Sequence, residues 1–278
     1  MSVNPLSSYF RQPSVYIKLP SEGRYWKEDC LDLPINGEIP VFPMTARDEI
    51  VLRTPDALAN GSGVVELIKS CCPNITDPWG MPGCDVDAVL IGIRIASYGQ
   101  EMDFDSKCPH CSHDNTHAVD LTHMLDHIRL ADYQTVLNIK KLKIKVKPQQ
   151  YFSVNQTSRI NFEEQQILRS ITSIEDENEK IEKFTEQLKR LVALNIQIVT
   201  DSTEYIETEH GQKVHSSEHI REFYENADNN IVKQVQNHLE KINKDAAIPK
   251  QNVECEECKK SYKVEITFDY ANFFGKGF

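Results

Sequence analysis

The sequence predicts an α+β fold, in which a mixed α/β core carries a four-cysteine zinc ribbon and an inserted α-helical domain. Two Cys-x-x-Cys pairs flanked by alternating segments predict the ribbon, and a long stretch without Gly or Pro predicts the helices. We expect five segments: an extended N-terminal arm with short strands (1–44), a helical core (45–100), a first zinc-knuckle hairpin with a following strand (101–154), the inserted helical domain (155–247), and a second zinc-knuckle hairpin with an aromatic C-terminal tail (248–278).

The pairs Cys108/Cys111 and Cys255/Cys258 have the spacing of a tetrahedral zinc site, because each short loop offers two thiolates to one metal ion. The 143 residues between the pairs (112–254) make a long loop. Closing that loop costs about 4 kcal/mol, whereas a structural zinc site supplies roughly 10–16 kcal/mol. We therefore predict one structural Zn²⁺ per chain, which fastens the middle of the chain to its C-terminal end.

Strand patterns around both pairs support the ribbon. Residues 102–105 and 116–121 alternate on either side of the first pair, and residues 251–254 and 262–268 flank the second. Each pair is therefore expected at the tip of a hairpin.

Upstream, prolines and short alternating segments predict an extended arm with strands near 15–19 and 39–44. Short helices are expected at 48–53, where Thr45 can cap the first turn, at 55–59 and at 64–72.

The clearest core helix covers 86–97 and is apolar on most sides, so we expect it to be buried. Asp85 is its expected N-cap, and Gly99 stands where a helix-ending glycine belongs.

Residues 160–194 predict one long helix or a helical hairpin with a coiled-coil-like seam. The seam has apolar residues seven apart, with three more on the same side: Ile160, Ile167, Ile174, Ile181 and Leu188, then Ile171, Phe184 and Leu191. Thr172 or Ser173 can cap a second helix. We favour packing of the seam within the chain, with contact to another subunit as the alternative. A polar linker at 200–212 then leads to helices near 217–226 and 229–244.

Composition and charge narrow the class of protein. The net charge of −11 argues against a nucleic-acid binder, and the lysines at 140, 141, 143, 145 and 147 alternate with apolar residues as in a solvated strand. No apolar run reaches the length of a membrane span, and the first ten residues lack a signal-peptide pattern. We therefore expect reduced thiols in a cytoplasm, with the remaining cysteines as buried apolar groups: Cys30, Cys71, Cys72 and Cys84.

No constellation of catalytic residues is evident, so we expect no enzymatic activity. Five histidines near the first pair are interpreted as surface residues, because four thiolates already fill a zinc coordination sphere: His110, His113, His117, His123 and His127. A deaminase needs a His-x-Glu at a suitable distance before the second pair, and a redox dithiol needs to open a βαβ helix. Neither pattern is present.

Aromatic residues cluster in the last eleven residues, including Phe273, Phe274 and Phe278. They can fill the small core of the ribbon or anchor the tail to another subunit, since aromatic side chains carry much of the energy of interfaces. For Phe273 and Phe274 the two interpretations stand equal. For Phe278, at the end of the sequence, we favour partner binding.

Four segments, in this order, resemble the T4-type bacteriophage baseplate proteins, a family that includes a baseplate hub subunit and a hub assembly catalyst. They are Ile-Lys-Leu-Pro-Ser (17–21), Pro-Met-Thr-Ala-Arg-Asp-Glu (43–49), Ile-Arg-Ile-Ala-Ser-Tyr-Gly (93–99) and Cys-Pro-His-Cys (108–111). The resemblance covers residues 15–130. It implies a structural or assembly protein of the tail baseplate, and no catalytic residues.

The sequence thus predicts a component of the baseplate hub or of its assembly, acting through protein–protein contacts. Its expected partners are other baseplate or tail-hub proteins, with homo-oligomers as a further option. Its expected location is the cytoplasm of an infected bacterium during assembly, or the virion tail. One alternative is a zinc-ribbon adaptor of a transcription or replication complex, for which nucleic-acid binding would depend on salt. Another is a metalloenzyme, which requires an exchangeable water on the metal.

Overall fold

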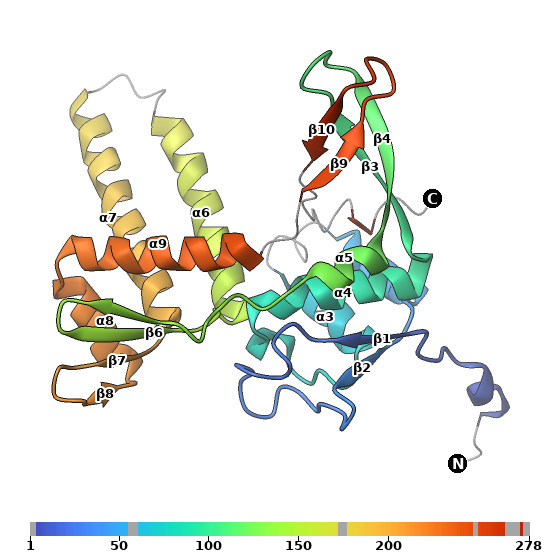
Figure 1. Ribbon diagram of the computed structural model, residues 1–278, viewed down its shortest axis with the longest axis horizontal. Helices are drawn as coiled ribbons and strands as arrows, with labels where there is room; N and C mark the ends of the chain where they lie inside the picture. The colour runs from blue at the N-terminus through green and yellow to red at the C-terminus, as the bar shows by residue number, and fades with distance from the viewer. Residues whose placement is uncertain (1–3, 55–60, 172–176, 247–249, 265–272, 275–278) are drawn as a thin grey trace. The chain divides into compact units, whose positions relative to one another are not determined.

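The computed structural model describes residues 4–54, 61–171, 177–246, 250–264 and 273–274 (Figure 1). These residues form an α+β protein of helices and small antiparallel sheets, which confirms the predicted class. The chain divides into two compact units. The first comprises Met1–Pro78, Cys84–Arg129 and Ala247–Phe278, and the second comprises Trp79–Gly83 and Leu130–Ala246. Within the described ranges, no helix has both the length and the apolar character that a membrane span requires.

The first unit combines three β-hairpins or strand pairs with four α-helices in its described residues. Its elements are η1 (Pro5–Tyr9), β1 (Val15–Lys18), β2 (Glu38–Val41), α1 (Ala46–Leu52), α3 (Ser62–Cys71), α4 (Gly83–Tyr98), β3 (Glu101–Lys107), β4 (Asp114–Asp120), α5 (Leu121–His127), β9 (Gln251–Glu254) and β10 (Ser261–Val264). The helices expected at 48–53 and 64–72 are confirmed as α1 and α3. The helix expected at 55–59 lies outside the described residues.

The core of the first unit forms where the β1–β2 pair meets α4. Ile17 is paired with Ile39 across the strands, and both side chains are fully buried. Gly92 of α4 allows this close approach, because a Cβ atom there would stand only 2.9 Å from Cγ2 of Ile17. Helix α4 buries most of its side chains, as its apolar sequence predicts.

Asp85 has a different role from the predicted one. Helix α4 begins at Gly83, so Asp85 lies inside the first turn and is not the N-cap. Its buried carboxylate accepts hydrogen bonds from the backbone N–H and the hydroxyl of Ser21 and from Nε1 of Trp26, the last at 2.9 Å. These partners are distant in sequence, so local capping preference could not reveal them. The carboxylate fastens the loop after β1 to the start of α4.

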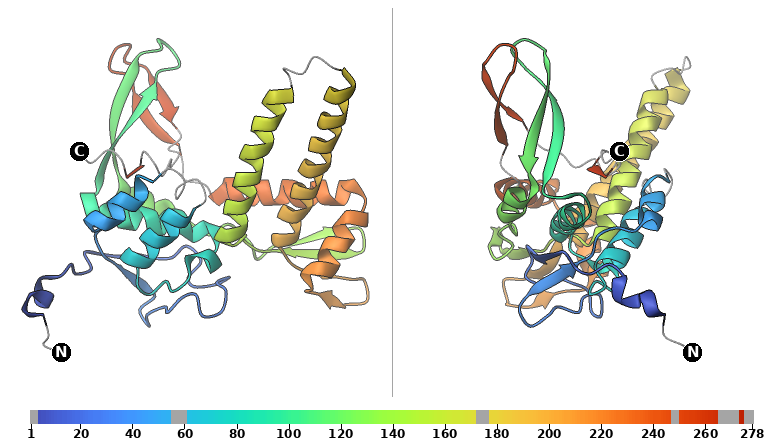
Figure 2. Two further views of the ribbon diagram at one scale, coloured as in Figure 1. Left: turned by 180° about the vertical axis from the view of Figure 1, so that it is seen from behind. Right: turned by 90° about the vertical axis from the view of Figure 1, so that its right-hand side faces the viewer.

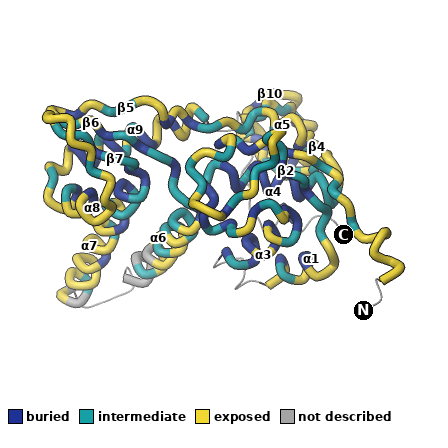
Figure 3. Tube along the Cα trace, turned by 90° about the horizontal axis from the view of Figure 1, so that it is seen from below, coloured by how far each residue is buried: buried dark blue, intermediate teal, exposed yellow. Residues whose placement is uncertain are grey.

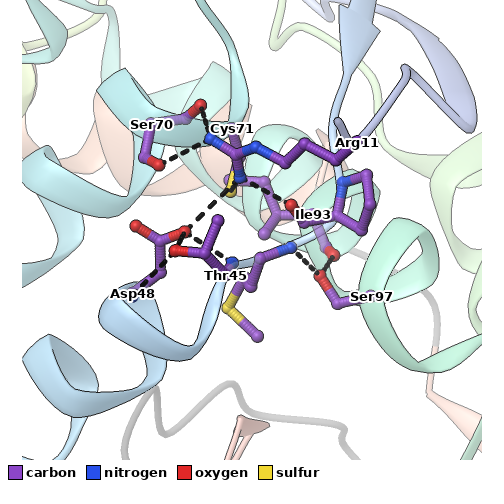
Figure 4. Close-up of polar contacts among 9 residues, drawn as sticks. Arg11, Thr45, Asp48, Ser70, Cys71, Ile93 and Ser97 are labelled. Atoms are coloured by element: carbon purple, nitrogen blue, oxygen red, sulfur yellow. Dashed lines mark hydrogen bonds and ion pairs between the residues drawn. The ribbon is translucent and has the colours of Figure 1, made fainter. Parts of the chain in front are cut away.

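Arg11 fastens the N-terminal arm to the helices of the first unit (Figure 4). Its guanidinium donates to the backbone oxygen of Pro43 at 2.6 Å and to the backbone oxygen and hydroxyl of Ser70 at 2.7 and 2.9 Å. It also forms an ion pair of 3.4 Å with Asp48. Asp48 and Thr45 form the capping box of α1, which confirms the predicted cap.

Met44 contributes a further link between the arm of the chain and α4. Its backbone N–H donates to the hydroxyl of Ser97 at 2.9 Å, and that hydroxyl donates to the carbonyl of Ile93 at 2.7 Å (Figure 4). Residues 43–49 and 93–99, two of the segments that carry the family resemblance, are thus in direct contact. They contribute hydrogen bonds that join the start of α1 to α4.

The second unit contains a four-stranded antiparallel sheet with the strand order β5-β6-β7-β8. The strands are β5 (Val136–Ile139), β6 (Leu142–Val146), β7 (Thr203–Glu207) and β8 (Lys213–Val214). Ile144 of β6 pairs with Ile206 of β7, and both are buried. The lysine-rich strand is solvated as predicted and lies among acids, since Lys143 forms an ion pair of 2.8 Å with Glu207.

Four helices complete the second unit: α6 (Tyr151–Ile171), α7 (Glu177–Asp201), α8 (Ser217–Asn226) and α9 (Asn229–Ala246). The last two confirm the helices predicted near 217–226 and 229–244. Helices α6 and α7 pack side by side as a helical hairpin, one of the two predicted alternatives (Figure 1). The expected caps Thr172 and Ser173 lie outside the described residues.

The expectation that the heptad seam packs within the chain is wrong for α7. Ile181, Phe184 and Leu188 are exposed, whereas Gln187 and Leu194, on a different face of the helix, are buried. A seven-residue spacing keeps side chains on one face but does not say which face meets a neighbouring helix. Ile174 and the side chain of Ile171 lie outside the described residues.

The second unit is also more than a set of helices. The predicted linker at 200–212 contains β7, because its short alternating segment pairs with β6. The unit further includes residues 79–83, whose Met81 carbonyl accepts from the backbone N–H of Tyr151 at 2.7 Å. Its boundaries therefore lie at Leu130 and Ala246, with a separate short segment at 79–83, whereas the expected insertion covers 155–247.

Candidate metal centre

Two β-hairpins of the first unit carry the Cys-x-x-Cys pairs at their tips. Strands β3 and β4 pair along their full length, from Glu101 opposite Asp120 to Lys107 opposite Asp114. Strands β9 and β10 pair in the same antiparallel manner. The two hairpins lie side by side and point the same way in both views of Figure 2. This arrangement confirms the two predicted hairpins with a Cys-x-x-Cys pair at each tip.

The two turns have the same backbone geometry. At the first, the N–H of Cys108 donates to the carbonyl of His113 at 2.9 Å, and the N–H of Ser112 donates to the carbonyl of Cys108 at 2.9 Å. The second repeats both hydrogen bonds, from Cys255 to Lys260 at 3.1 Å and from Lys259 to Cys255 at 3.0 Å. The residue after the second cysteine is left-handed in each turn, with φ of 61° at Ser112 and 56° at Lys259.

These turns bring all four sulfur atoms together. The Sγ atoms of Cys108 and Cys258 lie 3.7 Å apart, and those of Cys111 and Cys255 lie 3.6 Å apart. All four lie within 4.8 Å of one another, and none forms a disulfide. A tetrahedral metal site with zinc–sulfur bonds of about 2.3 Å has sulfur–sulfur edges of about 3.8 Å. The residues present therefore fit a tetrahedral metal ion, as the spacing predicts.

The thiols also influence one another's ionisation. Burial raises the pKa of Cys255, but the backbone N–H groups of Cys258 and Glu257 and the neighbouring thiols outweigh it and hold that pKa at about 6. A hydrogen bond from the backbone of His113 lowers the pKa of Cys111, but burial and the neighbouring thiols together raise it to about 12. One thiolate thus forms readily, whereas four thiolates so close together need a cation between them.

Side chains join the two hairpins beneath the sulfur atoms. The hydroxyl of Tyr262 lies 2.7 Å from Oγ of Ser106 and 3.1 Å from Nε2 of His117. The buried Asn115 accepts at Oδ1 from the backbone N–H of Glu256 at 2.9 Å. Sequence reasoning missed Asn115, Tyr262 and Ser106, because only the pairing of the hairpins brings them together.

The nearby histidines take no part in the sulfur cluster within the described residues. His110 and His113 are exposed on the turn, and His123 and His127 are ring neighbours on α5 with centroids 4.3 Å apart. His117 differs from the prediction of a surface residue, because it lies on β4, half-buried, against Tyr262. The position of His117 could have been predicted from the sequence, because it is a polar residue at an inward-facing position of an alternating strand.

Two of the three phenylalanines singled out in the aromatic tail lie within the described residues. Phe273 and Phe274 are buried in the first unit, with exposed fractions of 5% and 7%, and their rings meet edge to face. They are therefore buried within the chain itself, where Nε of Arg94 on α4 donates to the carbonyl of Phe273, and the buried cluster beneath the sulfur atoms consists of other residues. Phe278 lies outside the described residues.

The other cysteines stand apart from the cluster. Cys30, Cys71 and Cys72 are buried as expected, and burial raises the pKa of Cys71 to about 12. Cys84 is only half-buried and lies next to the Asp85 carboxylate, so the expectation of full burial is wrong for it.

A comparison with models of protein families shows to which family this chain belongs. The family model described as T4 bacteriophage base plate protein matches residues 27–275, nearly the whole chain. The chain belongs to the T4 bacteriophage base plate protein family. No curated protein and no solved structure matches it. The base plate family match confirms the resemblance read from four short segments, and it includes both units and all four clustered cysteines.

Proposed function

We propose that this base plate family protein is a structural or assembly component of the tail hub, working through contacts with other baseplate proteins. The family match over residues 27–275 carries this proposal. The net charge of −11 fits a protein that must stay dispersed until its partners assemble. On this proposal the protein acts in the cytoplasm of the infected bacterium and either stays in the tail or leaves after assembly.

We further propose that the four cysteines hold one Zn²⁺ with a structural role. The support is the donor set of four thiols and sulfur–sulfur distances of 3.6 and 3.7 Å, close to those of a tetrahedral site. Four thiolates leave zinc no position for a substrate or an exchangeable water. The metal would therefore fix the β9–β10 hairpin against β3–β4, while Tyr262 and Asn115 set how the two hairpins pair.

The absence of catalysis is part of the same proposal. A metalloenzyme needs an open coordination position, which a site of four cysteines does not offer. The adaptor alternative needs a basic surface, and the lysine-rich strand is engaged with acids, as in the ion pair of 2.7 Å between Lys141 and Glu209. Neither alternative has a specific observation in its favour.

The test is to remove the gene from the phage and to supply the protein from a plasmid. We expect infections without the protein to yield no complete baseplates in electron micrographs, and the wild-type plasmid to restore them. Mass spectrometry of purified virions then separates a tail component from an assembly factor. Normal tails without the protein would contradict the proposal.

The cysteine variant Cys255→Ser/Cys258→Ser tests the structural role of the metal in the same assay. Glu256→Gln/Glu257→Gln is its matched control, because it changes the same exposed turn and keeps both thiols. We expect the control to restore assembly and the cysteine variant to restore it poorly.

A further inference from the structure

Helix α7 exposes a continuous apolar stripe that no part of the described chain covers. Four large side chains three or four residues apart lie along one face, with exposed fractions of 62% for Ile181, 49% for Phe184, 46% for Leu188 and 58% for Val192. The tube in Figure 3 shows this helix exposed over much of its length. A surface helix normally turns such a stripe towards a core, so an exposed one indicates an interface.

The stripe ends at a cavity of about 430 Å³ within the second unit. Val192 belongs to both, and Ile196 of α7, Tyr224 of α8 and Val232 of α9 also line the cavity. The cavity is larger than one aliphatic side chain. It can therefore receive a side chain from whatever covers the stripe.

We propose that the stripe is the contact surface of a two-fold dimer, in which α7 pairs antiparallel with α7 of a second copy. The four apolar residues are spaced almost symmetrically about Glu186. An antiparallel pair centred there places Phe184 opposite Leu188 of the second copy. It also places Ile181 opposite Val192 of the second copy, at the mouth of the cavity, and the same contacts recur across the axis.

The charges beside the stripe favour a second copy over an unrelated partner. Glu182 and Lys189 are seven residues apart and flank the stripe on the same side of the helix. In the antiparallel pair, Glu182 lies beside Lys189 of the second copy, and Lys189 lies beside Glu182. The stripe and its flanking charges are therefore complementary to those of a second copy in the antiparallel direction.

The contact is small, so we expect a weak dimer with a Kd on the order of 100 µM. Sedimentation equilibrium of the full chain over a range of concentrations measures it. Leu188→Lys places a charge in the middle of the stripe without touching the core, and we expect it to be monomeric. Ile50→Lys, at an exposed apolar residue of α1, is the matched control and should dimerise as the wild type does.

Charge reversal tests the antiparallel pairing itself. Glu182→Lys and Lys189→Glu should each weaken the dimer about threefold to tenfold, and the double variant should restore it. The two residues are too far apart on one helix to form a pair within the chain, so restoration reports a contact between copies. Lys183→Glu, on the opposite side of α7, should leave the dimer unchanged. Circular dichroism melting curves verify that each variant is folded.

Several results would overturn the proposal. They are a wild-type chain that stays monomeric up to concentrations on the order of 1 mM, a Leu188→Lys chain that still dimerises, and single reversals that have no effect. A double reversal that fails to restore the dimer also overturns it, because Glu182 and Lys189 then do not meet across the two-fold axis.

Discussion

The hydroxyl of Tyr262 lies 2.7 Å from Oγ of Ser106, a residue 156 positions earlier in the chain. Tyr262 belongs to β10 and Ser106 to β3, so this contact joins the two hairpins of the candidate metal centre. The hairpins are therefore held at two levels, by the sulfur atoms at their tips and by hydrogen bonds below them.

Removal of the metal ligands should detach the second hairpin. In Cys255→Ser/Cys258→Ser we expect loss of one bound zinc and a loss of at least about 5 kcal/mol of stability in the first unit, because the binding energy exceeds the cost of loop closure. Elemental analysis and thermal unfolding measure the two effects. In the wild type, a chelator that removes the metal should reproduce the loss of stability. A metal-free wild type of equal stability would contradict the prediction.

Removal of the Tyr262 hydroxyl should weaken the pairing of the hairpins and leave the metal site intact. Tyr262→Phe keeps the ring, so only the hydrogen bonds with Ser106 and His117 are lost. We expect a loss of about 1 kcal/mol and unchanged zinc content. Tyr16→Phe, at an exposed tyrosine, is the control. Loss of zinc from Tyr262→Phe would show that these bonds position the ligands themselves.

Arg94 should hold Phe273 and Phe274, the part of the aromatic tail that the structure describes. Its buried guanidinium donates from Nε to the carbonyl of Phe273 at 3.2 Å and lies 4.5 Å from the centre of the Tyr98 ring. Arg94→Ala should lower stability by about 2 kcal/mol and speed hydrogen exchange at residues 273 and 274. Arg24→Ala, beside the exposed Glu22, should change neither. Unchanged exchange in Arg94→Ala would mean that packing alone holds the tail.

The sequence was most informative where the chemistry is local. Two Cys-x-x-Cys pairs between alternating strands predict hairpin tips, because the spacing and the strand period are properties of a few adjacent residues. Thr45 and Asp48 are three residues apart, so their capping box could be predicted in the same way.

Contacts between distant segments could not be predicted from local patterns. Asn115 accepts from Glu256, 141 positions away, and only the pairing of two hairpins brings them together. Strand β7 was taken for a linker because three of its five residues are Thr or Glu. Its partner β6 also lies 57 or more residues earlier, as Val146 pairs with Thr203. The seam of α7 was assigned to the wrong environment because periodicity identifies a face but not its neighbour.

The stability of the first unit should depend on the protonation of Asp85. Burial raises the pKa of this carboxyl above its ordinary value of 3.8, although hydrogen bonds from Ser21 and Trp26 lower it in part. The folded chain then binds the proton more tightly than the unfolded chain, so Asp85 contributes less stability as the pH rises above that value.

The variant Asp85→Asn isolates this effect, because its side chain has no proton to lose in this range. It loses part of the hydrogen bonding of the carboxylate, so we expect it to be less stable than the wild type. The difference in unfolding free energy should shrink as the pH rises above 3.8, since only the wild type loses stability from this group. Urea titrations at several pH values measure it, with Asp103→Asn on the exposed face of β3 as the control. A difference that grows with pH would show that the hydrogen bonds from Ser21 and Trp26 outweigh burial.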